Sequence, residues 1–390
     1  MALAGIAQYL PLSLALVTLV VFLVLGIDLA LGHRSIRFLK DVSPPLSANV
    51  PKVSVIVAAR NEERNIAQAL RSVLTQDYPN FEVIVVNDRS MDGTADILGR
   101  LAQAYPHLRV LYVRELPERW LGKNHALSMG AGRAAGELFL FTDGDVVMKP
   151  DTLSRAMGYT IEQQLDHVTV APELTLRGVL LNMFAGAFTI FFAVYARPWK
   201  ARDPRSTRYV GIGAFNLVRA EAYLAIGGHE PIAMRPDDDM KLGKLVKKHG
   251  LRQDIMFGTG MISVEWASSL REVINNLMKS AFPGLDYSLP LVIGATVVQL
   301  LFNVWPFAGI FVSTGLTRLV NVAIVLTILL IFIDNARLFR TKPWYALGFP
   351  LSALIMLYAL WKSTLTTLIN GGIEWRGTHY RLQDLKANKV

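Results

Sequence analysis

The chain has 390 residues, no cysteine and a formal net charge of +9 at pH 7. Without cysteine, disulfides and thiolate metal sites are excluded, and the positive mean hydropathy predicts membrane segments beside a folded domain. Much of the positive charge lies beside apolar segments, where attraction to anionic lipid headgroups explains it more simply than nucleic-acid binding does. We therefore expect a membrane as a partner and no nucleic acid.

The chain begins with an uncharged run, Met1 to Ile27, which basic residues follow. This run is longer than the roughly 20 residues that cross a bilayer, and it lacks the basic start of a cleaved signal peptide. We expect residues 1–40 to hold an uncleaved transmembrane anchor. The basic residues after it indicate that the next domain lies in the cytoplasm. Residues 43–47, Ser-Pro-Pro-Leu-Ser, are the expected linker.

Strands and helices then alternate along the chain. Runs rich in β-branched residues predict buried strands at 53–59 and 81–86, each followed by helical periodicity, and residues 108–113 supply a third strand. Such alternation predicts right-handed βαβ units and a mostly parallel sheet, whose ligands bind beyond the carboxyl ends of the strands. The expected fold class is α/β.

A further apolar run from Phe139 predicts a strand that ends in Asp143 and Asp145. Alternate side chains on a strand share a face, so both carboxylates could hold one cation. Mg²⁺ or Mn²⁺ prefers oxygen ligands and completes its shell with substrate phosphates and water. A surface turn capped by Asp-Gly-Asp is the alternative for this motif alone. Phosphoryl transfer would also use these groups, but the chain has no Gly-x-x-x-x-Gly-Lys loop.

Several ordered motifs between about residues 50 and 285 resemble the family 2 glycosyltransferases, which are inverting enzymes with a nucleotide-sugar-binding glycosyltransferase-A fold. The motifs are 53–63, 86–94, 122–127, 143–145, 213–219 and 226–230. The resemblance implies that Ala58, Glu62 and Asp88 hold the uracil and ribose of a UDP-sugar, with Asp143 also at the donor. It places Lys123 near the diphosphate, where an ammonium offsets negative charge. A solvated lysine at a helix start is the alternative.

The implied reaction also needs a base that removes the proton of the acceptor hydroxyl. In the family this base is the Asp of a Glu-Asp pair, whereas this chain has Asp237, Asp238 and Asp239 before Met-Lys-Leu. Matching Asp-Met-Lys-Leu to the family pattern favours Asp239 as the base and leaves Asp238 as the other candidate. Neighbouring carboxylates raise one another's pKa, which suits a base. An acidic cap on a helix over 240–249 is the other interpretation.

The acceptor side is expected at Gly213, Ala214 and Phe215. His229 could approach the cation or the acceptor, or could be a turn residue. The apolar stretch 180–195 predicts either a helix in the membrane interface or a buried domain helix.

Residues 275–282 lack the Gln-x-x-Arg-Trp motif of processive synthases in the family, which favours transfer of a single sugar. Residues 286–370 predict several transmembrane helices with a bend near Pro306, and residues 371–390 form a basic tail. Three complete crossings would leave this tail outside. A re-entrant segment bent at Pro350, or another division of the apolar residues, would give the cytoplasmic tail that we expect.

The order of anchor, catalytic domain over 50–285 and C-terminal helices resembles ceramide, hopanoid, carotenoid and diacylglycerol glycosyltransferases. This resemblance implies inverting, metal-dependent transfer of one sugar from a nucleotide-sugar donor to a membrane lipid hydroxyl. The protein would be a multi-pass protein of the cytoplasmic membrane. Two alternatives are a processive polysaccharide synthase and a membrane protein that keeps a degenerate transferase domain as a binding module. The motifs do not specify the sugar or the lipid.

Overall fold

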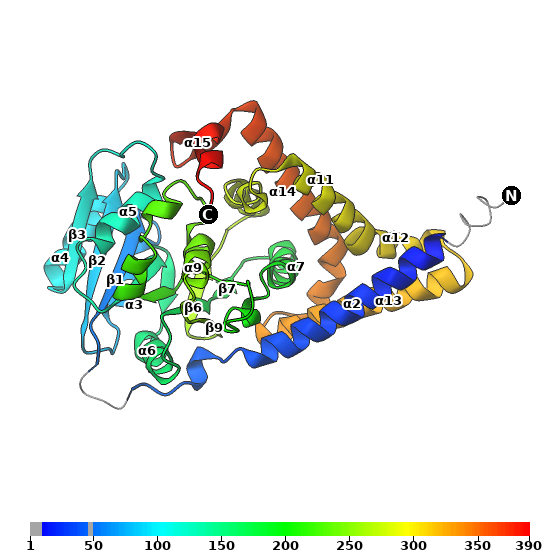
Figure 1. The fold of residues 1–390 in the computed structure, drawn as a ribbon, viewed down its shortest axis with the longest axis horizontal. Coiled ribbons are helices and arrows are strands. Elements are labelled where there is room, and N and C mark those ends of the chain that lie inside the picture. Colours follow the sequence, from blue (N-terminus) through cyan, green and yellow to red (C-terminus); the bar gives the residue numbers. More distant parts are fainter. Residues whose placement is uncertain (1–9, 46–49) are drawn as a thin grey trace. The chain divides into compact units, whose positions relative to one another are not determined.

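The computed structural model describes residues 10–45 and 50–390, in two compact units (Figure 1). The sheet unit comprises Ile36–Thr175, Pro198–Trp266 and Thr367–Val390, and the helical unit comprises the remaining segments up to Thr366. The first nine residues of the expected anchor, and residues 46–47 of the expected linker, lie outside the described residues.

The sheet unit is built on a seven-stranded sheet with the order β3-β2-β1-β4-β8-β6-β9. Its strands are β1 Val53–Ala59, β2 Phe81–Asp88, β3 Leu108–Val113, β4 Leu138–Asp143, β6 His167–Ala171, β8 Asn216–Arg219 and β9 Gln253–Phe257. Neighbouring strands are parallel except that β8 runs antiparallel to both β4 and β6. The predicted α/β class with a mostly parallel sheet is thus confirmed.

Helices cover both faces of this sheet because alternate strand residues are apolar on both sides. Val55 and Val57 of β1 belong to one buried cluster, whereas Ile56 between them belongs to another on the opposite face. The covering helices are α3 Ile66–Leu74, α4 Thr94–Ala104, α5 Gly122–Ala131, α6 Thr152–Glu162, α8 Ala220–Ala225 and α9 Asp238–Lys248. Because helices bury both faces of the sheet, a ligand can reach its side chains at the carboxyl ends of the strands.

Two smaller sheets complete the sheet unit. One has the order β5-β10-β7, and the other is the hairpin β11-β12. Their strands are β5 Val146–Met148, β7 Glu173–Thr175, β10 Ile262–Glu265, β11 Gly372–Trp375 and β12 Thr378–Arg381. The helix α15, Leu382–Ala387, follows the hairpin, so the expected basic tail is a folded part of the sheet unit.

The two carboxylates of the Asp-x-Asp motif do not share a strand. Strand β4 ends at Asp143, and Asp145 lies in the turn before β5. The strand expected through both residues is therefore wrong. The chain turns at residues 144–145 and leaves the seven-stranded sheet, since β5 belongs to the sheet with β10 and β7.

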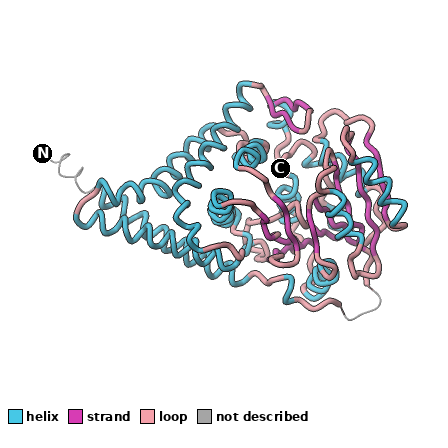
Figure 2. The backbone as a smooth tube through the Cα atoms, turned by 180° about the vertical axis from the view of Figure 1, so that it is seen from behind, coloured by secondary structure: helices cyan, strands magenta, loops and turns pink. Residues whose placement is uncertain are grey.

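The helical unit is built from helices (Figure 2), five of which are long and apolar. They are α2 Leu10–Ser35, α7 Val179–Ala196, α10 Leu270–Met278, α11 Leu289–Val298, α12 Trp305–Val312, α13 Gly315–Leu338 and α14 Phe349–Ile369. By length and composition, the described residues hold five helical segments able to cross a membrane. One of them is N-terminal, and three lie between residues 289 and 369, after the catalytic motifs, as predicted.

Helices α2 and α13 lie side by side and run in the same direction (Figure 1). An ion pair joins Arg34 and Asp334 near their C-terminal ends, with 2.7 Å between Nη2 and Oδ1. Helix α12 packs against α13, where Gly309 makes room for the Asn321 side chain. A π-helical stretch, Gln299–Val304, precedes Pro306. The regular α-helix is thus interrupted where the bend was expected, because proline removes a helical hydrogen bond.

Candidate active site

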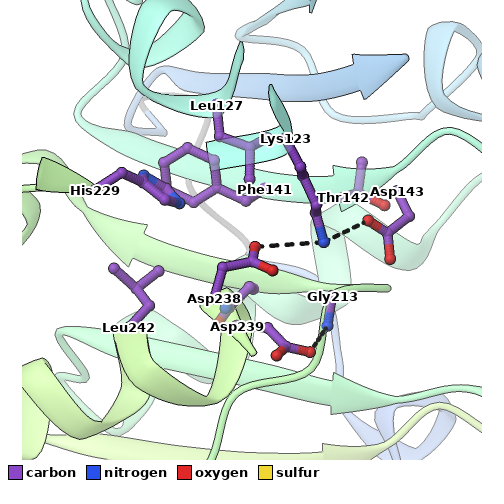
Figure 3. A pocket seen from close by; sticks show the side chains of 11 residues that line it. Lys123, Leu127, Phe141, Thr142, Asp143, Gly213, His229, Asp238, Asp239 and Leu242 are labelled. Atoms are coloured by element: carbon purple, nitrogen blue, oxygen red, sulfur yellow. Dashed lines mark hydrogen bonds and ion pairs between the residues drawn. The ribbon is translucent and has the colours of Figure 1, made fainter. Parts of the chain in front are cut away.

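A pocket lies at the carboxyl ends of the central strands, between the first turns of α5 and α9 (Figure 3). Eleven residues line it: Lys123, Leu127, Phe141, Thr142, Asp143, Gly213, Asn216, His229, Asp238, Asp239 and Leu242. The pocket thus combines one ammonium, three carboxylates and an apolar wall. Such a set of groups can bind a charged substrate and exchange a proton with it.

Lys123 forms ion pairs with two acids of this pocket. Its Nζ lies 2.9 Å from Oδ1 of Asp143 and 3.3 Å from Oδ2 of Asp238. Burial disfavours the charged ammonium, but the attraction of Asp143, then of Asp238 and Asp239, outweighs it and raises the pKa of Lys123. The side chain therefore stays charged, and a substrate diphosphate could replace the carboxylates as its partner.

Asp238 and Asp239 lie in the first turn of α9, which begins two residues before the expected Met240. Asp239 accepts hydrogen bonds from the backbone N–H of Gly213 at 2.8 Å and of Met240 at 2.7 Å. Burial raises the pKa of Asp238 to about 7, and it raises the pKa of Asp239 as well. Asp238 can consequently take up a proton near neutral pH, and Asp239 holds a proton more readily than an ordinary aspartate does.

The third acid of this run, Asp237, has a structural role. Two guanidinium nitrogens of Arg235 lie 2.8 and 3.0 Å from its carboxylate oxygens, and Nζ of Lys241 lies 3.5 Å away. This buried charge network fixes the segment just before α9. It leaves Asp238 and Asp239 as the acids of the run that line the pocket.

Asp143 and Asp145 form a second acidic pair beside the pocket. Burial first, then repulsion by Asp143 and by Glu62, raises the pKa of Asp145 to about 7. A divalent cation would relieve this repulsion, so the residues fit Mg²⁺ or Mn²⁺. Within residues 10–45 and 50–390, no three His, Cys, Asp or Glu side chains are grouped to hold a metal unaided. A cation here would need oxygen ligands from a substrate or from water.

The residues expected to bind the nucleoside lie at the ends of β1 and β2. Ala58 pairs in register with Asp143 of β4, and Glu62 lies in the loop after β1. Asp88 ends β2 and is buried between two arginines, with Nε of Arg89 at 2.7 Å and Nη1 of Arg60 at 3.4 Å. None of the three expected residues lines the pocket around Lys123. They form a neighbouring group, which we call the Asp88 cluster together with Arg60 and Arg89.

The four expected acceptor-side residues have different positions. Gly213 and His229 line the pocket, whereas Phe215 is fully buried in the hydrophobic core and Ala214 is nearly so. Nδ1 of His229 lies 2.7 Å from the Tyr223 hydroxyl. Burial, and then the charge of Lys123, lowers the pKa of His229 to about 3, so its ring is neutral. Only Gly213 and His229 can therefore meet a ligand in this pocket.

The sequence reasoning missed one charged contact in this region. Nη2 of Arg376, in the tail, lies 2.6 Å from Oε1 of Glu62. The local signal was an Arg-Gly pair between two short runs, which is typical of a two-residue hairpin turn. That signal predicts the hairpin but does not indicate what its tip contacts.

Comparison with known proteins agrees with this fold. A solved mannosyltransferase from Pyrobaculum calidifontis, in complex with GDP-Man and Mn2+, is similar with a TM-score of 0.55 and 19% identity, covering 90% of this chain and 98% of that one. The sheet and its acidic edge thus define a glycosyltransferase-A fold. Residues 54–224 match the family model Glycosyl transferase family 2.

Curated relatives extend over most of the chain. A 4,4'-diaponeurosporenoate glycosyltransferase of Staphylococcus aureus (strain bovine RF122 / ET3-1) is 25% identical over 349 residues, which are 86% of this chain and 90% of the relative. Its counterpart in strain USA300 is 24% identical over 346 residues, with the same shares covered. The family match within the sheet unit and the relatives named as glycosyltransferases agree, and the protein is a glycosyltransferase.

Close backbone packing fixes the position of Asp239. A Cβ atom on Gly211 would lie 1.8 Å from the carbonyl oxygen of Asp239, and one on Gly243 would lie 1.9 Å from that of Val210. Both distances are far below van der Waals contact. The segment at 210–211 therefore packs directly on the backbone of α9.

Replacing Gly211 with Ala should displace the start of α9, lower stability by about 1–3 kcal/mol and remove most of the transferase activity. The matched control is Gly99→Ala in α4, where a new Cβ has no atom within 4 Å. That control should gain about 0.5–1 kcal/mol from helix propensity and keep full activity. Thermal unfolding and turnover of both variants test this. Full activity of Gly211→Ala would show that α9 tolerates the shift.

Proposed function

We propose that the protein transfers a single sugar, with inversion, from a nucleotide-sugar donor to a membrane lipid, and we favour a UDP-sugar as the donor. The observation that carries this proposal is the pocket in which Lys123 lies between Asp143 and the acids of α9. It supplies a cation for a leaving diphosphate and a carboxylate for an acceptor proton.

The proposed base is Asp239. It accepts the proton of the acceptor hydroxyl as that oxygen bonds to the anomeric carbon, while the bond from this carbon to the diphosphate oxygen breaks. The two backbone N–H groups that bind Asp239 hold its carboxylate in one orientation. Asp238 would keep Lys123 in place. It is the alternative base, because its own pKa lies near 7.

The leaving diphosphate gains negative charge as the sugar departs. Lys123 would stabilise that charge directly. Asp143 and Asp145 would hold Mg²⁺ or Mn²⁺, which would supply further charge neutralisation at the diphosphate. Ala58, Glu62 and Asp88 would bind the nucleoside. This assignment places the nucleoside over β1 and β2 and the sugar toward α9.

The acceptor proposed is a lipid that reaches Gly213 and His229 from the membrane. The relatives are named for 4,4'-diaponeurosporenoate, and the ending of that name denotes a carboxylate. A carboxylate acceptor carries no proton at neutral pH and would need no base. The carboxylate of Asp239, which lines the pocket and is held by two backbone N–H groups, favours a hydroxyl acceptor in this chain, because such an acceptor has a proton to give up.

Connectivity supports a definite membrane topology. Helix α7 leaves the sheet unit after Thr175 and returns to it at Pro198, so a single crossing there would separate parts of one folded unit. Residues 267–366 also leave the sheet unit and return to it. They must therefore cross the membrane an even number of times, so that the sheet unit stays on one side. We propose crossings by α2, by α11–α12 together and by α13, with α7 and α14 lying along the membrane interface. The sheet unit and the tail would then both be cytoplasmic.

Cysteine labelling tests this topology, because the natural chain has no cysteine. A cysteine at Ser313, between α12 and α13, should react with an impermeant maleimide on intact cells. A cysteine at Lys389, in the tail, should react only after the membrane is opened. Labelling of Lys389→Cys on intact cells would contradict the proposed count of crossings.

A donor screen tests the function. Purified protein with Mn²⁺ and total membrane lipid is incubated with UDP-glucose, UDP-galactose, UDP-N-acetylglucosamine and GDP-mannose, and nucleotide release is measured with and without lipid. Lipid-dependent release from one donor is expected. Release that depends on an added oligosaccharide primer would favour the processive synthase. No release from any donor would favour the binding module.

A further inference from the structure

The C-terminal tail folds against the Asp88 cluster. The tip of its hairpin carries Arg376, whose Nη2 lies 2.6 Å from Oε1 of Glu62 and whose Nη1 donates to the carbonyl oxygen of Arg60 at 2.8 Å. One guanidinium thus binds both the side chain and the backbone of the loop after β1. Two such contacts from one planar group fix the direction in which Glu62 points.

The turn that presents Arg376 is conformationally costly. Trp375 pairs with Thr378, which leaves Arg376 and Gly377 as a two-residue loop with φ values of 50° and 76°. This is the pattern of a turn that favours Asn or Gly at its first position. An arginine in this left-handed conformation is uncommon, and such strain is concentrated at ligand-binding sites. An arginine is thus an unfavourable residue for this turn, and its guanidinium contacts with Glu62 and Arg60 give a reason for its presence there.

The body of the hairpin covers the other side of the Asp88 cluster. The Tyr380 hydroxyl accepts a hydrogen bond from the backbone N–H of Gly122 at 3.2 Å. Hydrogen bonding to Asp88 raises the pKa of Arg89, and a further hydrogen bond to Tyr380 raises it more. Tyr380 is itself buried, with Ile373 opposite it in the hairpin. The hairpin therefore contacts the first residue of α5 and an arginine of the cluster at once.

A second attachment holds the tail beyond the hairpin. Oδ1 of Asn388 accepts from the backbone N–H of Met234, and its Nδ2 donates to the carbonyl oxygen of Pro231, at 3.1 and 2.9 Å. This segment leads directly into Asp237 and the acids of α9. The tail is therefore attached both at the hairpin tip, through Arg376, and beyond the hairpin, through Asn388, and these two attachments hold the hairpin in one position.

We propose that Arg376 and Tyr380 of the hairpin 372–381 form a wall of the subsite for the donor nucleoside diphosphate, and that Arg376 is the residue that positions Glu62 within it. This inference rests on the proposed function, since that function assigns the nucleoside to Glu62 and Asp88. Arg376 also cancels the charge of Glu62, which would otherwise repel the anionic nucleotide. Tyr380 closes the same subsite from the side of α5.

Isothermal titration of UDP and GDP into the full-length protein in lipid nanodiscs tests the proposal. Arg376→Ala should weaken binding of the preferred nucleotide about tenfold, the loss typical of a charge-assisted contact. Arg376→Lys should lose less, because it keeps the charge but not the two-point geometry. Tyr380→Phe should weaken binding severalfold.

The matched control is Arg381→Ala, in the same hairpin. Its side chain is 82% exposed and its ion-pair partner is the nearby Asp384. This variant should bind nucleotide within twofold of the parent. Where transfer is measurable, Arg376→Ala should raise the KM for donor and leave kcat and the KM for lipid nearly unchanged, which general unfolding would not do.

Unchanged or tighter nucleotide binding by both Arg376→Ala and Tyr380→Phe would overturn the inference, and tighter binding would show that the hairpin blocks the subsite. The result is separable from the proposed function. Transfer of sugar with unchanged nucleotide affinity in these variants refutes the wall alone. Nucleotide binding that depends on Arg376, without transfer from any donor, supports the wall and refutes the proposed reaction.

Discussion

Replacing Asp239 with Asn should lower the kcat for sugar transfer by about 10²- to 10⁴-fold, the range that loss of a general base produces. The amide keeps the size of the side chain but cannot take the acceptor proton. Its oxygen can still accept one of the hydrogen bonds that Gly213 and Met240 now donate. Binding of UDP should therefore change little, which separates a lost base from a lost fold.

Asp238→Asn is the comparison that identifies the base. If Asp239 is the base, Asp238→Asn should cost less in kcat. It should also move the rise of activity to lower pH, because removing the neighbouring charge eases ionisation of Asp239. In the parent protein, activity should rise with pH in a range above that of an ordinary aspartate, since burial raises the pKa of Asp239 and its ionised form is the active one. A larger loss in Asp238→Asn would reverse the assignment.

An Asp239→Asn variant that keeps near-normal transfer would contradict the role of a base altogether. That outcome would point to an acceptor without a proton to remove, such as the carboxylate for which the relatives are named. The pH dependence would then disappear as well. The two measurements together distinguish the two kinds of acceptor.

Asp143→Asn should reduce transfer at least about tenfold and should weaken its stimulation by Mn²⁺, because a metal held by carboxylates contributes several kcal/mol to charge stabilisation. Chelation with EDTA should reduce the activity of the parent protein similarly, and added Mn²⁺ should restore it. The same addition should not restore Asp143→Asn. Titration of Mn²⁺ against initial rate measures this.

The control for Asp143 is Asp96→Asn, an exposed acid in the first turn of α4. It removes the same charge far from the pocket and should leave both rate and Mn²⁺ dependence unchanged. Full activity of Asp143→Asn in EDTA would mean that Lys123 neutralises the diphosphate without a metal. Lys123 can take that role because its ammonium already lies 2.9 Å from Asp143, at the position proposed for the diphosphate.

The sheet could be predicted where burial alone determines the pattern. β1 and β2 are runs of apolar residues that are mostly buried, and they lie where those runs predict; β3, at the edge of the sheet and buried only at its two ends, also lies where it was predicted. The local pattern did not distinguish Asp145 from a strand residue, because Asp-Gly-Asp suits a strand end and a turn equally. Phe215 belongs to a motif that the family resemblance assigns to the acceptor, but its side chain fills the core.

The contacts of the tail could not be predicted. The pair formed by Arg376 and Glu62 joins residues more than 300 positions apart, and no periodicity links them. The distinct partners of Asp237 and Asp238 were also beyond the sequence, since both are acids in one run and only packing assigns Arg235 to the first and Lys123 to the second.

The measurement that tests the central claim most directly is mass spectrometry of the lipid extract after reaction with the donor that the screen identifies. The account predicts one new lipid species, heavier by a single sugar, whose amount falls at least 10²-fold with Asp239→Asn. A ladder of species separated by one sugar, or a water-soluble polymer with no modified lipid, would contradict single-sugar transfer to a membrane lipid.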